Sequence, residues 1–477
     1  MPSRHVALRE RVPAPLRQGL AQLREALGVP NGFDERVLAE AERAAAGVRM
    51  PDRDLTDVPF VTIDPEGSMD LDQALHIARD GAGYLIRYAI ADVAAFVTPG
   101  GAIDAECHQR VETLYAPNRR TPLHPELLSE NAASLLPDVV RPALVWELSL
   151  DAAGALTATS VARARIRSRR KYSYDEAQRL LDAGAADEVL TLLAEVGPLR
   201  EASERERGGI NLGVPEQEIR VQGSAWTLYY RTTLPCEGWN AQISLLTGMA
   251  AARLMLDAGV GILRTLPPAE DHAIERLRRT AQGLGISWPR RVGYPDFVRG
   301  LDAAVPRQAA MLNACTTLFR GAGYDAFTDG APANAEHAAI AAPYAHVTAP
   351  LRRLVDRYAG EICVALCAGE PVPAWVLAAL ENLPTEMEVS GRRSSRYERG
   401  IVDLVEAMVL APRIGQEFTG LLIDVDPDRE AGRLQLRDPA VEARVKGGRR
   451  LQLGTEITAT LVAADLVAGK VDFRAFV

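Results

Sequence analysis

The segment from Thr62 to Ala74 constrains this chain most, because it joins a short apolar run to a tight turn that carries several acidic residues. The run from Val58 to Ile63 predicts a buried strand. Pro65 and Gly67 follow it and predict a turn. The acidic residues therefore lie at the end of a strand and across a turn from it, at the mouth of a sheet.

Three carboxylates in this segment have a spacing that suits a metal ion. Asp70 and Asp72 are two residues apart, and alternate side chains of an extended chain point to the same face. Asp64 lies at the strand end, so all three could converge on one hard cation. Mg²⁺ prefers oxygen ligands and keeps water or substrate phosphate in its remaining positions. The alternative is a polar turn whose aspartates bind their own backbone.

The composition is that of a globular protein with two or three domains: 477 residues, 47% hydrophobic and 25% charged. No apolar run approaches the ~20 residues of a membrane span, and Met1 to His5 lacks the apolar core of a signal peptide. We therefore expect a cytoplasmic protein without membrane association. The net charge of -9 argues mildly against a polyanion partner, although an acidic exterior can enclose a basic channel.

Basic residues with a period of two supply a candidate lining for such a channel. A strand over this stretch would carry one entirely basic face, extended by Arg170 and Lys171. The residues of that face are Arg163, Arg165, Arg167 and Arg169. The alternative is a solvated strand edge that positive charge protects from unwanted pairing.

Residues 1–50 are expected to be helical and separate, because Leu16 to Leu27 and Glu35 to Ala46 are rich in helix formers between prolines. They predict a helical N-terminal domain, either helix-turn-helix-like or a simple helical cap. After the acidic segment, Ala74 to Ala78 and Tyr84 to Ile90 flank a glycine-containing turn and predict a β-hairpin.

The rest of the chain divides into a long helical part and a β-rich tail. From Tyr174 to Met408 the apolar residues recur mainly at helical spacing. Beyond residue 412 they fall in short segments separated by glycine and Asp-Pro turns: Phe418 to Val425, Arg433 to Leu436 and Glu456 to Val462. A tail of this length with short strands predicts a compact five-stranded barrel of the OB type.

The acidic segment resembles the first motif of the ribonuclease II and ribonuclease R family of exoribonucleases. In the family, Thr-Ile-Asp is followed by Asp-x-Asp; the corresponding aspartates here are Asp64, Asp70 and Asp72. The family pattern continues with another aspartate, where this chain has Gln73. A glutamine carbonyl can ligate Mg²⁺ or hold its water, but it contributes no negative charge.

Further motifs resemble the family in the same order, over roughly residues 55 to 410. They are Ile90 to Val93, Leu114 to Pro117, Tyr344 to Arg357 and Arg396 to Arg399. The resemblance implies an α+β fold with a ribonuclease II-type catalytic domain, residues 51–410, of mixed sheet packed with helices. A small helical domain would precede it, and an OB-type RNA-binding barrel, residues 411–477, would follow it.

The resemblance also implies roles for individual residues. Arg352 would clamp the scissile phosphate, Tyr115 would stack on the terminal base, and Glu398 would hold the 3′-terminal ribose. Where the family's central helix shows adjacent acids, this chain has Trp239 to Gln242, so a ribose contact is lost or replaced. The implied metal ligands are Asp64, Asp70, Asp72 and Gln73, and the implied catalytic residues are Asp70, Asp72 and Arg352.

These roles imply a Mg²⁺-dependent 3′-to-5′ exoribonuclease that acts as a monomer, hydrolyses single-stranded RNA processively and releases nucleoside 5′-monophosphates. Gln73 and the missing acids favour an alternative, a catalytically weakened RNA-binding member of the family. A third hypothesis is an unrelated Asp-x-Asp phosphatase. That class needs threonine or valine two places after the second aspartate, where this chain has Ala74.

Overall fold

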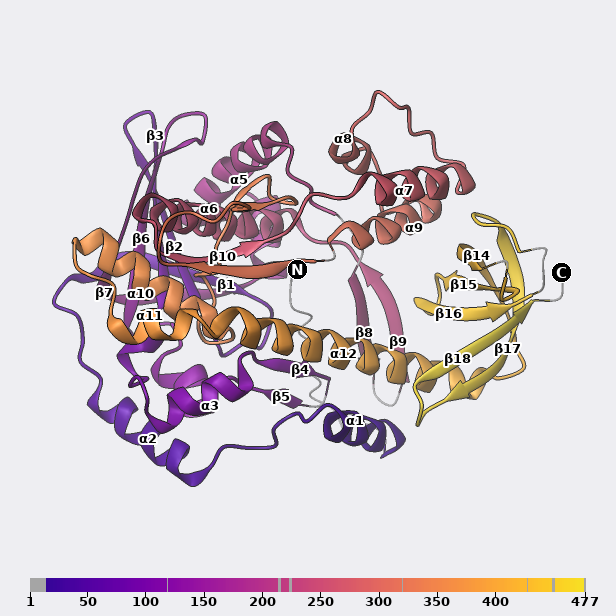
Figure 1. Cartoon of the computed structure of the whole chain (residues 1–477), viewed down its shortest axis with the longest axis horizontal. Coiled ribbons are helices and arrows are strands. Elements are labelled where there is room, and N and C mark those ends of the chain that lie inside the picture. The colour runs from indigo at the N-terminus through magenta and orange to yellow at the C-terminus, as the bar shows by residue number, and fades with distance from the viewer. Residues whose placement is uncertain are drawn as a thin grey trace.

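The computed structural model describes residues 14–117, 119–212, 216–222, 225–319, 321–426, 428–447 and 451–475. Two closed β-barrels lie toward opposite ends of the molecule, and helices cover and connect them (Figure 1). One long helix, α12 (Leu383–Leu410), runs from the helices beside the first barrel to the second barrel. The candidate site lies on the first barrel.

The N-terminal barrel has the strand order β1-β2-β3-β6-β7. Neighbouring strands are antiparallel except β1 and β7, whose parallel pairing closes the barrel. The predicted hairpin is present as β2–β3, and the strand predicted at 58–63 is the inner end of the longer β1. The strands are β1 (Asp54–Asp64), β2 (Gln73–Asp80), β3 (Gly83–Ala91), β6 (Val140–Leu150) and β7 (Leu156–Ser173).

Short elements in the connection from β3 to β6 form one wall of the candidate site. A two-stranded hairpin follows α3 (Ala102–Arg110), and a single π-helical turn, Leu128–Ala132, precedes β6. The hairpin consists of β4 (Leu114–Ala116) and β5 (Arg119–Thr121). It carries Tyr115, one of the residues implied to bind substrate.

Helices from the central part of the chain cover the N-terminal barrel and share its apolar core. The predicted helical character of this part is confirmed, although three antiparallel strand pairs interrupt it. The helices are α4 (Tyr174–Asp182), α5 (Glu188–Arg207), α6 (Pro235–Ala258), α10 (Leu354–Ala368) and α11 (Ala374–Leu380). The paired strands are β8 (Glu216–Gln222) with β9 (Ala225–Arg231), β10 (Gly261–Thr265) with β11 (Gly323–Phe327), and β12 (Glu336–His337) with β13 (Ala342–Pro343).

Three helices form a small cluster with its own apolar core beside the second barrel. They are α7 (Asp271–Gly283), α8 (Tyr294–Arg299) and α9 (Pro306–Cys315). Leu421 of the second barrel joins this core, so the cluster is packed against the barrel. None of the helices in the described part of the chain is long and apolar enough to cross a bilayer.

The C-terminal barrel has the strand order β14-β15-β16-β18-β17 and is closed by parallel pairing of β16 and β18. The three predicted segments correspond to β14, β15 and β17, whereas β16 and β18 were not predicted individually. The strands are β14 (Glu417–Asp426), β15 (Ala431–Leu436), β16 (Val441–Lys446), β17 (Glu456–Asp465) and β18 (Lys470–Ala475).

The two predicted N-terminal helices are present as α1 (Ala14–Ala26) and α2 (Glu35–Gly47). Leu16 of α1 belongs to the apolar cluster of α12 and the C-terminal barrel, whereas Val37 of α2 belongs to the core of the N-terminal barrel. Each helix therefore stabilises a different part of the molecule.

The predicted arginine-rich strand is present as β7, but three of the four arginines on the predicted basic face are engaged within the protein. Arg163 lies 2.9 Å from the buried carboxylate of Asp92. Arg165 lies 2.9 Å from Asp54, and Arg169 donates to a backbone carbonyl of β1 at 2.7 Å. These contacts argue against a channel lining for this face. They do not make it a solvated strand edge either, because β7 pairs with both β1 and β6 in the closed barrel.

Candidate active site

Burial of the loop between β1 and β2 fixes the positions of the aspartates. Asp64 is the last residue of β1, and Asp72 immediately precedes β2. Between Asp70 and Asp72, Leu71 is fully buried, and its N–H donates to the Ser134 hydroxyl at 2.9 Å. Burial and hydrogen bonding of Leu71 therefore fix the backbone between Asp70 and Asp72.

Asp64 has a carboxylate oxygen that is buried without a hydrogen-bond partner. The atom is Oδ2, which is inaccessible to solvent. Burial raises the pKa of Asp64 to about 7, and the charge of Asp70 adds to the increase. Lys171 and Arg352 oppose the increase, so both cations lie close enough to act on this carboxylate. A buried acceptor of this kind is suited to a cation.

Asp72 is 3% exposed and faces the segment that carries Arg352. Its Oδ1 accepts a hydrogen bond from the Leu351 N–H at 2.8 Å, and its Oδ2 lies 3.5 Å from Nε of Arg352. Burial raises the pKa of Asp72 well above the ordinary carboxyl value, although Arg352 and the Leu351 N–H oppose this. Asp72 therefore connects the acidic loop to the arginine implied to bind phosphate.

Backbone contacts fix Arg352 beside the aspartates. Its carbonyl accepts from the Thr113 N–H at 3.0 Å, and its own N–H donates to the Ala349 carbonyl at 3.2 Å. Asp356, in the first turn of α10, accepts from the Ala349 N–H at 2.7 Å. The loop before α10 is thus held on two sides, and the Arg352 side chain stays 28% exposed next to Asp72.

Asp70 is held by two side chains of the β4–β5 hairpin. Nη1 of Arg120 lies 2.6 Å from Oδ1 of Asp70, and the Tyr115 hydroxyl donates to Oδ2 at 3.2 Å. Tyr115 and Arg120 are directly opposite in the hairpin, so their side chains lie on the same face. Burial raises the pKa of Tyr115, and the charge of Asp70 raises it further. The structure thus places Tyr115 next to a predicted metal ligand.

Two family models match this chain. The RNB domain matches residues 52–367, and the RNase II-type exonuclease C-terminal S1 domain matches residues 416–476. The chain belongs to the RNase II and RNase R family. The first match spans the acidic loop and Arg352, and the second spans the C-terminal barrel. The predicted family and fold are confirmed.

Two relatives show how much of a family member is present. Ribonuclease R of Aquifex aeolicus is 25% identical over an alignment that covers 94% of this chain and 68% of that protein. Ribonuclease R of Escherichia coli is also 25% identical, and the alignment covers 83% of this chain and 51% of that protein. The chain thus spans from about half to about two thirds of the length of these RNase R relatives.

Solved structures share the fold. The apo form of Mycoplasma genitalium RNase R gives a TM-score of 0.86 at 20% identity, covering 97% of this chain and 78% of that chain. Yeast Ssd1, described as a pseudonuclease, gives a TM-score of 0.68 at 16% identity, covering 86% of this chain and 53% of that chain. Both likenesses concern the fold alone.

Gln73 and Glu398 were also implied to be site residues, and their contacts differ from those that the aspartates make. Gln73 begins β2, and its side-chain amide nitrogen donates to the Thr348 carbonyl in the loop that leads to Arg352. Glu398 is exposed on α12 and acts electrostatically on Glu112, which lies beside that loop. The metal role of Gln73 and the ribose role of Glu398 stay predictions.

Lys171 is a site residue that the sequence placed elsewhere, at the end of the basic strand face. In the parallel register of β1 and β7 it lies opposite Thr62, close to the strand end. Its ammonium group donates to the Ser68 carbonyl. Burial lowers its pKa, while Asp64 and Asp70 oppose the change. The sequence gives no local signal of this position, because it follows from the pairing of two distant strands.

The segment that replaces the family's adjacent acids also borders the site. Asn240 on α6 is buried, and its Nδ2 donates to the Ile63 carbonyl at 3.5 Å. It also shares a hydrogen bond with the side chain of Tyr174. Asn240 therefore supports the strand end that carries Asp64 without adding charge.

The donor chemistry of these residues suits a hard divalent cation such as Mg²⁺, although the described side chains are not grouped as a metal site in this structure. The three aspartates supply oxygen ligands, and the buried Oδ2 of Asp64 accepts no hydrogen bond. Within the described residues, no three His, Cys, Asp or Glu side chains are grouped in a way that could hold a metal ion. The cationic side chains that lie among the aspartates are Arg120, Lys171 and Arg352.

Proposed function

We propose that this chain is a Mg²⁺-dependent exoribonuclease that hydrolyses single-stranded RNA processively from the 3′ end and releases nucleoside 5′-monophosphates. The observation that carries the proposal lies inside an RNB domain: the charge of Asp70 acts on both Asp64 and Asp72, Asp72 lies beside Arg352, and Asp70 accepts a hydrogen bond from Tyr115. The fold-related RNase R of Mycoplasma genitalium has been solved with single-stranded and with double-stranded RNA, which supports an RNA substrate. We expect the chain to act as a cytoplasmic monomer.

Each of these side chains has a distinct chemical part in the proposal. Asp64, Asp70 and Asp72 would hold Mg²⁺, which supplies an activated water and neutralises charge on the phosphoryl oxygens when bound. The partly exposed guanidinium of Arg352 would bind two oxygens of the scissile phosphate. The ring of Tyr115 would stack on the terminal base, a contact that tolerates any sequence.

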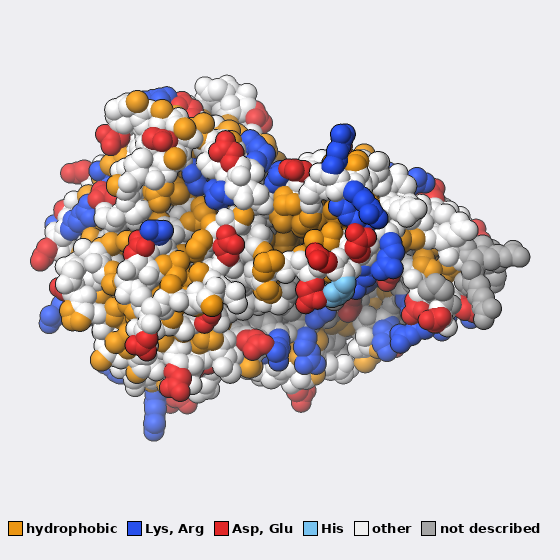
Figure 2. All heavy atoms as spheres, turned by 45° about the horizontal axis from the view of Figure 1, so that its top comes forward, with side chains coloured by type: hydrophobic (Ala, Val, Ile, Leu, Met, Phe, Trp, Pro, Cys, Tyr) orange, Lys and Arg blue, Asp and Glu red, His pale blue; other side chains and the backbone are white. Residues whose placement is uncertain are grey.

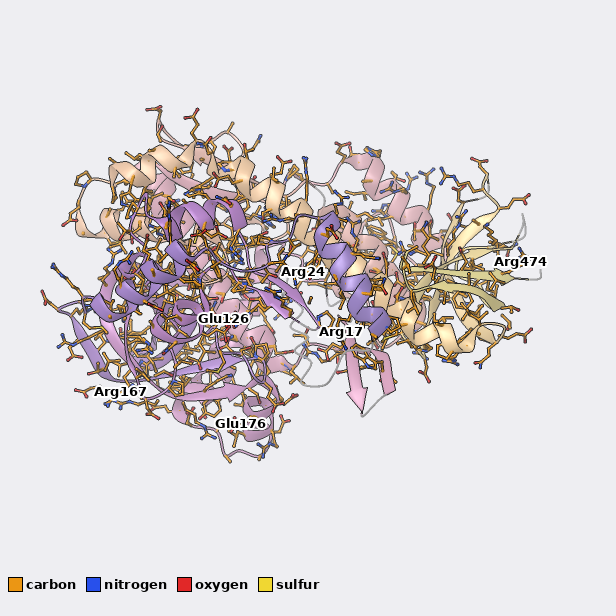
Figure 3. All side chains as sticks on the ribbon, turned by 90° about the horizontal axis from the view of Figure 1, so that it is seen from below. Arg17, Arg24, Glu126, Arg167, Glu176 and Arg474 are labelled. Atoms are coloured by element: carbon orange, nitrogen blue, oxygen red, sulfur yellow. The ribbon has the colours of Figure 1, made fainter. Side chains whose placement is uncertain are left out.

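The C-terminal barrel offers a surface for upstream nucleotides. Its strands β15, β16 and β18 expose four basic side chains, which we call the barrel basic face: Arg433, Arg444, Lys446 and Arg474. Arg433 lies opposite Arg444, and Lys446 lies opposite Arg474, so the charges adjoin. Figure 3 shows Arg474 on the barrel, far from Arg167 on the catalytic part. Figure 2 shows further basic side chains gathered near α7 to α9.

An assay with RNA labelled at its 3′ end tests the proposal. With Mg²⁺ we expect labelled mononucleotides to appear at once, while chelation of the metal stops their release. A 5′ label on the same RNA should pass directly to a short end product without intermediate lengths, because a processive enzyme does not release its substrate between steps. A DNA strand of the same sequence is the control. Absence of labelled mononucleotides would contradict the proposal.

A catalytically weakened RNA-binding member of the family is the second candidate. The amide of Gln73 is committed to the Thr348 carbonyl, and this residue brings no charge where the family pattern has an aspartate. Yeast Ssd1, the pseudonuclease, shares the fold. In the same assay, this candidate predicts that RNA is bound but remains intact at every Mg²⁺ concentration.

A further inference from the structure

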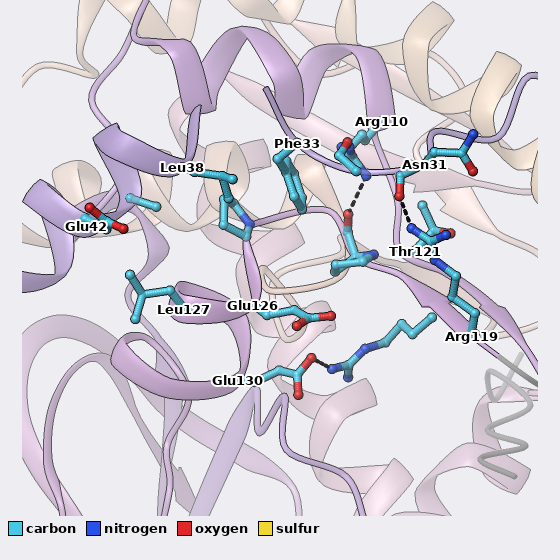
Figure 4. Close-up of a pocket in the computed structure, with 15 residues that line it drawn as sticks. Asn31, Phe33, Leu38, Glu42, Arg110, Arg119, Thr121, Glu126, Leu127 and Glu130 are labelled. Carbon is cyan, nitrogen blue, oxygen red and sulfur yellow. Dashed lines mark hydrogen bonds and ion pairs between the residues drawn. The ribbon is translucent and has the colours of Figure 1, made fainter. Parts of the chain in front are cut away.

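Arg120 lies between the candidate metal site and an open cleft. Its Nη1 is 2.6 Å from Oδ1 of Asp70, and its Nη2 pairs with Glu130 in the π-helical turn. The Asp70 side chain is 8% exposed and Arg120 is 22% exposed. The cleft has a volume of about 530 Å³, and Arg119, Arg120, Glu126 and Glu130 are among its lining residues. The dashed line at Glu130 in Figure 4 marks its ion pair with Arg120.

Both oxygens of Asp70 are occupied in this arrangement. Oδ1 faces Arg120, and Oδ2 accepts from the Tyr115 hydroxyl. A divalent cation that bound Asp70 would compete with these donors for the carboxylate oxygens. A hydroxyl can rotate and accept instead of donate, but a guanidinium keeps its charge at every physiological pH. Arg120 is therefore the donor that competes with a metal ion.

We propose that Asp70, Arg120 and Glu130 form a latch that sets the metal affinity of the site. In the closed arrangement Arg120 bridges the two carboxylates. When a divalent cation takes Asp70, Arg120 keeps its pairing with Glu130 and turns toward the cleft. The inference rests on the proposed metal site, but its test does not require hydrolysis.

Glu130 is essential to this arrangement for an electrostatic reason. A partly buried guanidinium without a partner is costly, because its hydration is lost and nothing replaces it. Glu130 supplies that partner after Asp70 is taken and thereby lowers the cost of metal binding. Lys171 and Arg352 differ from Arg120, since both act on Asp64 and neither is among the residues that line this cleft.

Titration calorimetry with Mg²⁺ alone, in the absence of RNA, tests the latch. Arg120→Gln removes the competing cation, and we expect about tenfold tighter Mg²⁺ binding. Glu130→Gln leaves Arg120 with Asp70 as its carboxylate partner, and we expect severalfold weaker binding. Arg119→Gln and Glu126→Gln make the same charge changes at exposed neighbouring positions on the same cleft and should alter the affinity less than twofold.

The double variant Arg120→Gln/Glu130→Gln distinguishes a latch from a general effect of charge. A general effect predicts that the two single changes add. The latch predicts that Glu130→Gln has no effect once Arg120 is absent, so the double variant binds Mg²⁺ as tightly as Arg120→Gln. Additive changes, or single variants that match their neighbouring controls, would overturn the latch.

The proposed function and the latch can fail separately. Wild-type protein that binds Mg²⁺ and RNA but releases no mononucleotides would refute the nuclease, while the pattern of Mg²⁺ affinities would still decide the latch. If wild-type protein binds no Mg²⁺ and Arg120→Gln does, the latch is supported. If neither binds Mg²⁺ while thermal unfolding shows both to be folded, the latch is refuted.

Discussion

Asp64 and Asp465 each end a strand of a barrel, and their environments are opposite. Each is the last residue of a strand, β1 in one barrel and β17 in the other. Asp465 is exposed, and its Oδ1 accepts from the N–H groups of Val467 and Ala468 at 2.8 and 3.0 Å, which lowers its pKa. Asp64 has a buried oxygen without a partner, and burial raises its pKa to about 7.

The chain beyond each strand end explains the difference. In the C-terminal barrel a short turn satisfies Asp465 locally. In the N-terminal barrel, Lys171 and Arg352 reach Asp64 from distant parts of the chain. The same residue type at the same strand position is therefore a turn former in one barrel and a candidate metal ligand in the other. The comparison favours the first barrel as the place where a cation would be held, and we propose that the second barrel contacts RNA.

The prediction with the largest expected effect removes the charge of one aspartate at each barrel. Asp72→Asn should lower the rate of RNA hydrolysis by at least about a hundredfold, because one ligand charge is lost while the Leu351 N–H keeps an acceptor. RNA affinity should change less than twofold, because many phosphate contacts share it. Asp465→Asn, the matched control in the second barrel, should leave hydrolysis unchanged. Wild-type turnover by Asp72→Asn would refute the site assignment.

The converse test removes charge from the barrel basic face. The double variant Arg444→Gln/Lys446→Gln should weaken RNA binding roughly tenfold at low salt and flatten its salt dependence. The rate on a saturating short oligonucleotide should be retained, because the catalytic side chains are untouched. Arg36→Gln/Arg43→Gln removes the same charge from the exposed side of α2 and is the control. Equal affinities of the two double variants in filter-binding titrations would contradict the assignment of RNA contact to the second barrel.

Local patterns in the sequence were sufficient for much of the fold. The alternation in β2 and β3, the turn between them and the helical spacing after Tyr174 are properties of short segments, and all were predicted. The parallel pairings that close each barrel were not, because they join strands that are distant in the sequence. The same limit explains why β16 and β18 were missed individually.

The residues of the candidate site also divide into those that a local sequence pattern predicts and those that it cannot predict. The spacing of Asp64, Asp70 and Asp72 marked them from the sequence, because all three lie in one loop. Arg120 and Lys171 could not be identified, since one reaches the site through a hairpin and the other through the register of β1 and β7. Residues that complete a site from distant segments have no local signature.

A third prediction concerns how the second barrel is attached. Glu406 on α12 is 5% exposed, and its Oε1 accepts from Nε2 of Gln217 at 2.9 Å and from the Glu442 N–H at 3.3 Å. Burial raises its pKa to about 7, although those two hydrogen bonds lower it, and the charges of Asp403 and Glu442 raise it further. The folded-state pKa lies above the ordinary value of 4.5, so stability is greatest at low pH and is lost as the pH rises through 7.

Glu406→Gln should therefore match the wild type near pH 4, below the ordinary pKa of 4.5, and exceed its free energy of unfolding by about 2 kcal/mol at pH 8. The amide oxygen of glutamine can still accept both hydrogen bonds. Chemical denaturation at several pH values measures the difference. Glu456→Gln, an exposed change in the same barrel, should show no such trend. A difference that is constant with pH would show that folding does not raise the pKa of Glu406.

The fourth prediction tests the residue that departs from the family pattern. Gln73→Asp should lower the Mg²⁺ concentration for half-maximal activity severalfold, because an anionic ligand binds a hard cation better than an amide. It should also lower kcat, because aspartate cannot donate to the Thr348 carbonyl. Gln73→Met removes the donor without adding charge and should lower kcat alone. An unchanged Mg²⁺ titration in Gln73→Asp would place residue 73 outside the metal's ligands.

The smallest predicted effect appears only at the end of digestion, where the two barrels contribute differently. As RNA shortens, contacts with the C-terminal barrel are lost first, and the stacking contact of Tyr115, worth ~1 to 3 kcal/mol, becomes a growing share of the remainder. Tyr115→Ala should therefore degrade long RNA at nearly the wild-type rate but stop at longer end products. Gel analysis of complete digests with excess Mg²⁺ measures the terminal length.

Tyr115→Phe separates the two contacts of this side chain, because it keeps the ring and removes the hydroxyl that donates to Asp70. If stacking sets the end product, Tyr115→Phe should stop where the wild type stops, and only the loss of the ring should lengthen the product. If the hydrogen bond to Asp70 matters instead, both variants should stop at the same greater length. Identical end products in all three proteins would place Tyr115 away from the bound 3′ end, and the β4–β5 hairpin would then contribute no stacking contact through this residue.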